Sequence, residues 1–144
     1  MLPVGLIFTS EIIGKEIIGE TSKGIFGLLT GINEFNIPHV NTILEELDIY
    51  KIVEIVESLF EEINKGQHTI EYIPAQIMAY KNLHEINVRI KDELESLKDN
   101  IELSKQYWFT YFRTAPYHEN LINLKRFKKI LDSRLDLVFR LQNV

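Results

Sequence analysis

Two stretches of the chain resemble motifs that carry chemistry, and each lacks the residue that this chemistry needs. Residues 14–21 place two glycines and a threonine as a phosphate-binding loop does, but Glu20 stands where the loop has its lysine. A carboxylate at that point repels phosphate, so the segment does not predict nucleotide binding. His84 and Glu85 begin like the helix of a zinc protease, but Val88 occupies the position of the second histidine ligand.

The remaining acidic and nucleophilic residues show no catalytic arrangement. Neighbouring carboxylates such as Glu45–Glu46 and Glu61–Glu62 suit acid–base catalysis in principle, yet such pairs more often form a solvated helix face. None of the six serines has the context of an activated nucleophile, and the chain contains no cysteine. We therefore expect a protein that is not an enzyme, with no cofactor, no metal and no small-molecule substrate.

Charge is unevenly distributed along the chain. Residues 1–102 carry 18 acidic and 8 basic side chains, whereas residues 103–144 carry 3 acidic and 8 basic ones. A basic segment beside aromatic residues is one way to bind nucleic acid, here through residues 105–140. We favour the alternative, in which this end docks on the glutamate-rich face of residues 45–62, in the same chain or a neighbour. The candidate anion contacts are Lys125, Arg126, Lys128 and Lys129.

Aromatic side chains are concentrated just before most of these bases, in residues 107–112. In a helix this run points in too many directions for one buried face. Either a partner chain covers some of the rings, or the rings close one end of a helical bundle. If a partner covers them, the candidate contact residues are Trp108, Phe109, Tyr111 and Phe112.

Glycine and isoleucine dominate residues 5–32, and a helical wheel places Ile17, Ile25 and Ile32 on one side of this segment. Its glycines would make the helix unstable alone, at about 1 kcal/mol each relative to alanine, so packing must hold it. Gly24 and Gly31 are the candidate points of close helix approach. The segment is too charged to span a membrane. It has the amphipathic character to lie on a membrane surface, although its acids outnumber its lysines.

Three further segments have the apolar periodicity of helices. Residues 42–65 begin with a capping box at Thr42 and end before Gly66, and residues 33–40 are expected to form a loop. A long helix is expected from Pro74 to about residue 113, and a last one over about 117–142. The last helix has more apolar surface than one neighbouring helix can cover. The expected stripes are Leu83, Ile86, Ile90, Leu94, Leu97, Ile101 and Trp108 in the long helix, and Leu124, Phe127, Leu131, Leu135 and Val138 in the last, widened there by Ile130, Leu137 and Leu141.

These segments predict an all-α fold, a single elongated bundle of three to four helices with one long helix over about 74–113. No linker divides the chain, so residues 1–144 are expected to form a single helical domain. Its 5–32 segment would pack on, or extend from, a bundle over 42–142.

Such a bundle leads us to expect a structural or scaffold subunit that works by contact with other protein chains, including copies of itself. The chain has 21 isoleucines and only 3 alanines, a bias typical of AT-rich genomes, so a minor virion component of a large DNA virus is a fitting context. The alternatives are peripheral membrane attachment through 5–32 and, third, nucleic-acid binding. We expect the protein in the cytoplasm or within a virus particle assembled there.

Overall fold

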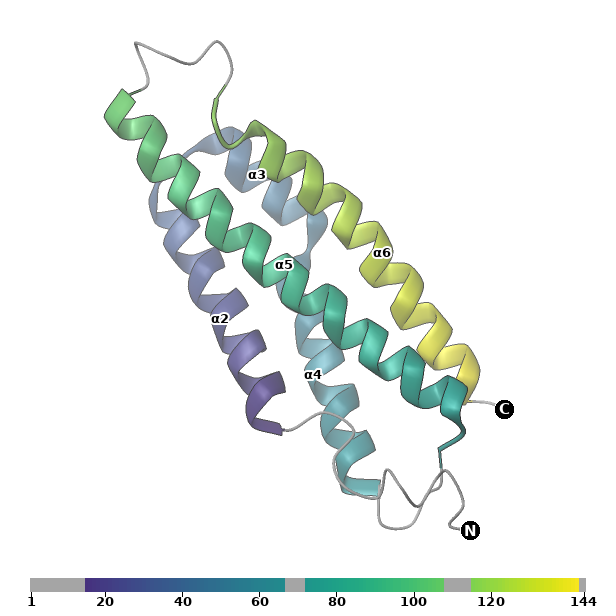
Figure 1. Ribbon diagram of the computed structural model, residues 1–144. Coiled ribbons are helices and arrows are strands. Elements are labelled where there is room, and N and C mark those ends of the chain that lie inside the picture. The colour runs from purple at the N-terminus through teal and green to yellow at the C-terminus, as the bar shows by residue number, and fades with distance from the viewer. Residues whose placement is uncertain (1–14, 67–71, 108–114, 143–144) are drawn as a thin grey trace.

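The computed structural model describes residues 15–66, 72–107 and 115–142, and it confirms the all-α bundle (Figure 1). Throughout these residues the regular structure is helical. The long helix is confirmed in α5, whose 34 residues extend over about 51 Å at 1.5 Å per residue. Its expected continuation to residue 113 lies outside the described residues, and it is unbroken through Asp99 and Asn100. The helices are α2 (Lys15–Glu34), α3 (Pro38–Leu47), α4 (Ile49–Gly66), α5 (Pro74–Tyr107) and α6 (His118–Gln142).

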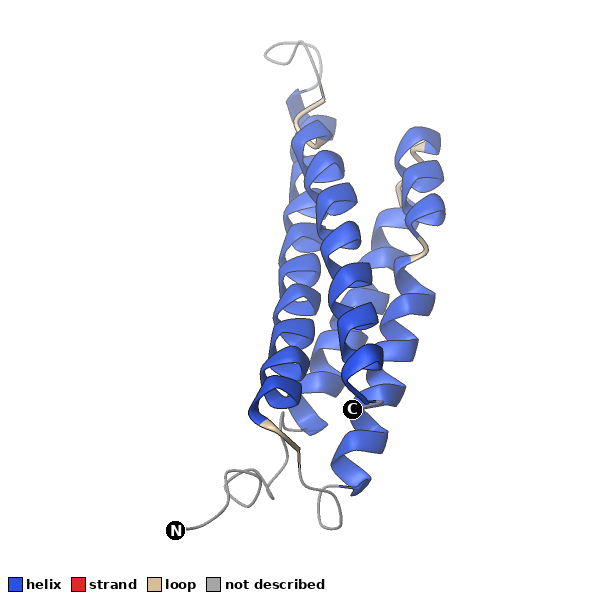
Figure 2. Ribbon diagram, turned by 90° about the vertical axis from the view of Figure 1, so that its right-hand side faces the viewer, coloured by secondary structure: helices blue, strands red, loops and turns tan. Residues whose placement is uncertain are grey.

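The helices form four rods, because α3 and α4 follow each other with a single residue between them (Figures 1 and 2). α2 packs on α4, α5 packs on both α2 and α6, and α3 packs on α6. α2 and α5 run in the same direction, side by side, while α4 and α6 run back (Figure 1). The bundle therefore consists of two antiparallel pairs, α2 with α3–α4 and α5 with α6, placed next to each other.

The core is built from the stripes that the apolar periodicity predicts. The six apolar side chains expected in α5 from Leu83 to Ile101 are fully buried, and the five expected in α6 from Leu124 to Val138 are buried. Residues three and four apart lie on the same side of a helix, so each stripe presents one continuous apolar face to its neighbours. α5 touches α2 on one side and α6 on the other.

The prediction of one helix over 42–65 is wrong, and the loop predicted over 33–40 is limited to residues 35–37. α3 already begins at Pro38, where the missing N–H of proline costs nothing in the first helical turn, and Thr42 lies inside it. The helix stops at Asp48, which has left-handed backbone angles of φ 52° and ψ 39°. Its N–H donates to the carbonyl oxygens of Leu44 and Glu45, and aspartate tolerates this conformation better than most residues.

The apolar side of α2 also differs from its expected position. Ile18, Ile25 and Ile32, seven residues apart, are buried, whereas Ile17 is about half exposed. A seven-residue spacing in a helix returns to nearly the same direction, so these three side chains form one line against α4 and α5. Ile17 lies about 100° from this line and faces outward. Residues 1–14, including the rest of the expected 5–32 segment, lie outside the described residues.

Candidate interaction surface

The boundary between α5 and α6 is fixed by polar contacts along its length. Near the start of α5, Gln76 Nε2 donates to the carbonyl oxygen of Leu141 at 2.9 Å. Two turns further along, Arg134 Nη1 donates to the carbonyl oxygen of Asn82 at 2.7 Å and lies 3.5 Å from the Glu85 carboxylate. Hydrogen bonds from side chains to backbone oxygens are short and directional, and the one from Arg134 is strengthened by its charge. The two contacts therefore fix how far α6 is shifted along α5.

A partly buried polar cluster around the buried Asn120 continues this boundary toward the other end. The Glu93 carboxylate accepts hydrogen bonds from Asn123 at 2.8 Å and from the buried Asn120 at 3.1 Å. The Asn120 amide also donates to Ser96 Oγ at 3.0 Å, and its oxygen accepts from Asn100 at 2.8 Å. Each atom has a defined partner, so sliding one helix along the other would break several hydrogen bonds at once. Sequence reasoning missed this cluster. The available signal was Asn120, which lies four residues before Leu124 on the apolar stripe of α6.

Phe127 of α6 lies between the Arg134 contact and the Asn120 cluster in sequence, and two guanidinium groups lie near its ring. Arg89 of α5 is 4.5 Å from the ring centroid and Arg126 of α6 is 5.2 Å from it, both within the range of cation–π contact. Phe127 is buried while Arg126 is exposed. Arg126, a predicted anion contact, therefore also covers a ring of the core.

Large apolar side chains remain exposed along the outside of this boundary, on what we call the outer face. Met78 precedes Asn82 by one turn and is 63% exposed, and Leu137 follows Arg134 by one turn and is 46% exposed. The two contacts at Gln76 and Arg134 bracket these side chains, so they lie on adjoining turns of the two helices. Leu103 of α5 lies 18 residues, or five full turns, after Glu85 and therefore extends the same edge. The apolar members of the outer face are Met78, Leu103, Ile122 and Leu137, all exposed.

The two helices give the outer face opposite charges on its two edges. The α5 edge carries three exposed acids at seven-residue spacing, Glu85, Asp92 and Asp99. The α6 edge carries the exposed bases Arg126 and Lys129, whereas Arg140, further along, pairs with Asp136 at 2.6 Å. Met78 and Leu137 lie toward one end of the outer face, and Leu103 and Ile122 lie toward its other end.

The structure separates the four predicted anion contacts into two groups. Lys125, Arg126 and Lys129 are exposed on α6, whereas Lys128 is half-buried and pairs with Asp132 at 3.0 Å. The predicted docking of this basic end on the acids of residues 45–62 is not made by ion pairs: in the described part of the chain, those formed by α6 join it to itself or to Glu85 of α5. α3 nevertheless packs on α6.

The two predicted glycine contacts lie against lysines of the same chain. A Cβ atom added at Gly24 would lie 2.5 Å from Lys91 Cε, and one added at Gly31 would lie 3.4 Å from Lys98 Cε. In each pair the lysine follows the glycine by 67 residues in sequence. This constant offset shows that α2 and α5 run parallel at these positions. The glycines make room for lysine stems that cross from α5, and contact with a second chain at these positions stays a prediction. The predicted aromatic contacts Trp108, Phe109, Tyr111 and Phe112 lie outside the described residues.

An aromatic cluster joins α4 to α5 inside the bundle. The ring of Phe60 meets those of Tyr80 and His84 edge-on, with centroids 6.4 and 6.3 Å apart, and Tyr72 meets Tyr80 in the same way at 5.5 Å. Burial raises the pKa of both tyrosines, and the negative charge that Tyr80 would acquire raises the pKa of Tyr72 further. Burial lowers the pKa of His84 from its ordinary 6.5, because the charged imidazolium is poorly solvated there.

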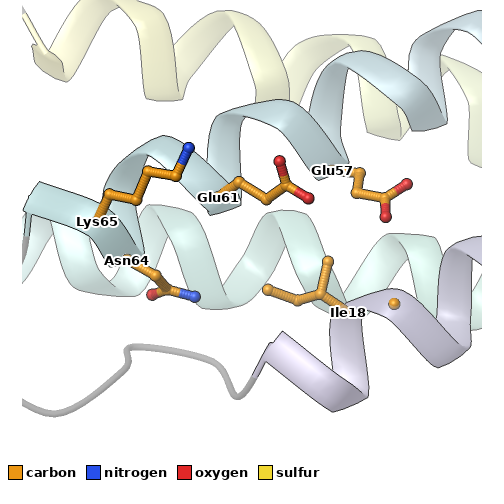
Figure 3. A pocket seen from close by; sticks show the side chains of 6 residues that line it. Ile18, Glu57, Glu61, Asn64 and Lys65 are labelled. Atoms are coloured by element: carbon orange, nitrogen blue, oxygen red, sulfur yellow. The ribbon is translucent and has the colours of Figure 1, made fainter.

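A small hollow of about 250 Å³ lies between the beginning of α2 and the end of α4 (Figure 3). Glu57, Glu61 and Lys65 follow one another at four-residue spacing along α4 and line it, with Asn64 beside them. Ile18 points toward the hollow from α2 (Figure 3). With two carboxylates and one ammonium on the same stretch of helix, the hollow favours no single class of ligand.

The described helices and these surfaces define a four-rod α-helical bundle with an amphipathic outer face. Within the described ranges, no three His, Asp or Glu side chains are placed to hold a metal ion. None of the helices over residues 15–66, 72–107 and 115–142 has the length and hydropathy needed to cross a membrane. Comparison of the chain with protein-family models, with curated proteins and with solved structures finds no match.

Proposed function

We propose that this chain is a non-enzymatic structural subunit that assembles with other protein chains through helix faces, beginning with a second copy of itself. The observation that supports the proposal best is the outer face of α5 and α6. Met78 and Leu137 are large, apolar and exposed on adjoining turns, next to a boundary that is otherwise closed by specific contacts. Contiguous exposed apolar side chains with a polar rim are typical of protein–protein contact surfaces.

The charges of the outer face favour a second copy over an unrelated partner. A twofold axis parallel to the helices places α5 of one subunit opposite α6 of the other. The acidic edge with Glu85, Asp92 and Asp99 then meets the basic edge with Arg126 and Lys129, twice per dimer. The apolar side chains meet along the axis. Charge complementarity of this kind orients two copies and disfavours other pairings.

Sedimentation of the full chain over a range of concentrations tests the proposal. We expect the wild type to form dimers and Leu137→Glu to remain monomeric, because a carboxylate in the apolar part of the contact would be buried without a partner. Ile55→Glu is the matched control: Ile55 is 45% exposed, almost the same as Leu137, but lies on α4 away from the outer face. It should leave the dimer intact.

A wild-type chain that is monomeric at every concentration would contradict the proposal, as would equal loss of dimer in both variants. Salt gives an independent measure. Pairing of the acidic and basic edges should weaken as ionic strength rises, because exposed charges are screened over about 8 Å at physiological salt. A dimer held by the apolar residues alone would not weaken in this way.

A further inference from the structure

The contacts across the α5–α6 boundary fix the position of each residue of α6 along α5. Four contacts spread along this boundary join residues whose numbers add to 216 or 217. They are Gln76 with Leu141, Asn82 with Arg134, Arg89 with Phe127, and Glu93 with Asn123. Because the two helices are antiparallel and rise by the same 1.5 Å per residue, this relation holds along the whole boundary. The number of any residue of α6 therefore gives the residue of α5 that lies beside it.

The same relation gives the pairs of residues that face each other in the proposed dimer. A twofold axis parallel to the helices leaves every residue at its own position along that axis. A residue of α6 therefore faces the α5 residue of the partner subunit that has the same position along the axis. Arg126 lies beside residues 90–91, within about 3 Å of Asp92 along the axis. Leu137 lies beside residues 79–80, equally close to Met78. One alignment thus brings together a charged pair and an apolar pair.

Two arginines at the charged pair have no carboxylate partner among the described residues. Of the arginines that the structure describes, Arg134 and Arg140 each form an ion pair within the chain. Arg89 and Arg126 do not, and both are exposed. Their guanidinium groups lie 4.5 and 5.2 Å from the centroid of the Phe127 ring. Contact with this ring restricts both side chains, so less conformational entropy is lost when a carboxylate binds to them.

The acids next to these arginines in the same chain already have other partners. Glu85 and Glu93 lie one turn before and one turn after Arg89 in α5. The Glu85 carboxylate lies 3.5 Å from Arg134, and the Glu93 carboxylate accepts hydrogen bonds from two asparagines. Asp92 is exposed and forms no ion pair within the part of the chain that the structure describes. Its carboxylate is therefore available to a partner subunit.

We propose that Arg126, with Arg89 beside it, binds the Asp92 carboxylate of the partner subunit and so sets the alignment of the dimer. This inference rests on the proposed function and narrows the contact between two charged edges to one ion pair, which the symmetry forms twice. A guanidinium group presents parallel N–H donors that match the two oxygens of a carboxylate. A twofold axis perpendicular to the helices would instead place α5 on α5, with acid facing acid, and like charges disfavour that arrangement.

Charge reversal of either residue, followed by sedimentation of the full chain, tests the proposal. Asp92→Arg and Arg126→Glu should each weaken the dimer about tenfold or more, because each places like charges opposite each other at two points of the contact. Lys125→Glu is the matched control for Arg126→Glu, since it makes the same change of charge at the neighbouring exposed residue. Lys125 points about 100° away from Arg126 round the helix axis, so this variant should dimerise as the wild type does.

A mixture of the two reversed chains shows whether the pair forms between chains. A dimer of one Asp92→Arg chain with one Arg126→Glu chain has opposite charges at both points, whereas each variant alone has like charges at both. We therefore expect the equimolar mixture to form dimers at a concentration where neither variant does so alone. Recovery on mixing requires a contact between chains, because a folding defect within either chain would persist in the mixture.

Three results would overturn the proposal. These are an Asp92→Arg chain that dimerises as the wild type does, equal loss of dimer in Lys125→Glu and Arg126→Glu, and a mixture that forms no more dimer than its components. Asp92 is exposed, so Asp92→Arg decides the first result even if Arg126→Glu, which uncovers Phe127, lowers the thermal midpoint. If the wild type dimerises and Leu137→Glu does not, these results would reject the ion pair alone. A wild type that is monomeric at every concentration would reject both the ion pair and the proposed function.

Discussion

His84 is the one histidine of the described chain whose pKa burial clearly lowers, and this makes it a source of pH-dependent stability. It is half-buried in α5 with its ring edge-on to Phe60 of α4. Burial disfavours the charged form, so the folded chain holds His84 neutral at pH values where the unfolded chain is already protonated. The stability that this contributes is complete above the unfolded pKa of about 6.5. It is lost as the pH falls from there toward the lower folded pKa.

We therefore expect acidification below about pH 6.5 to destabilise the wild type more than His84→Gln, which cannot be protonated in this range. Urea unfolding at a series of pH values measures the difference. His39→Gln is the control, because His39 is exposed on α3, and its profile should follow the wild type. Parallel profiles for the wild type and His84→Gln would show that burial of this ring does not carry the effect.

The glycines of α2 are not equivalent, and a pair of alanine substitutions separates them. No atom lies within 4 Å of a Cβ added at Gly27, whereas one added at Gly24 meets Lys91. Gly27→Ala should stabilise the chain by about 1 kcal/mol, because alanine restricts the unfolded chain and favours the helix. Gly24→Ala should gain less, because the Lys91 stem must first move away. Thermal and urea unfolding of both variants test this, and equal gains would show that Lys91 does not occupy the space at Gly24.

At the scale of elements, the polar cluster between α5 and α6 does more than fill space. Asn120 is buried and connects Glu93, Ser96 and Asn100 across the boundary, whereas Asn123 makes a single hydrogen bond at its edge. Leaving a buried polar group without its hydrogen-bond partner lowers the free energy of unfolding by about 1–3 kcal/mol. The cluster therefore favours one alignment of α6 along α5 over shifted ones.

Asn120→Ala should lower the free energy of unfolding by about 1–3 kcal/mol, because it leaves the Asn100 amide without its acceptor and removes two donors from the cluster. Asn123→Ala, which removes one hydrogen bond at a half-buried position, should cost about 0.5–1.5 kcal/mol. Urea unfolding measures both. A cost for Asn120→Ala no larger than that for Asn123→Ala would contradict a central role for Asn120.

The helices with long apolar stripes were predictable from the sequence. The helix break that depends on the backbone conformation of a single residue was not. α5 and α6 each repeat apolar residues over many turns, so a single shifted residue does not change the face that is buried. The break at Asp48 depends on one residue in a left-handed conformation inside a continuous apolar pattern, and periodicity cannot register it. The outer face was predictable only in part. The excess apolar surface of α6 pointed to Leu137, but Met78 becomes its neighbour only because of how α5 and α6 are aligned along each other in their antiparallel packing.

For the molecule as a whole, the proposed contact surface belongs to one of the two helix pairs. The outer face belongs to α5 and α6, and α2 packs on α4 in the other pair. α5 packs on α2 and α3 packs on α6, so both pairs contribute to one shared core.

Self-association through the outer face has a consequence for the stability of the whole molecule. A dimer that forms only from folded chains stabilises the folded state by mass action, so the thermal midpoint should rise with protein concentration. We expect this rise for the wild type and for Ile55→Glu. Met78→Glu and Leu137→Glu should instead have midpoints that do not change with concentration. Because Met78 and Leu137 are exposed in the single chain, their variants should match the wild type at the lowest concentration, where the monomer predominates. A midpoint lowered in these variants at every concentration would mean that the side chains stabilise the monomer, and the outer face would then not be a contact between two copies.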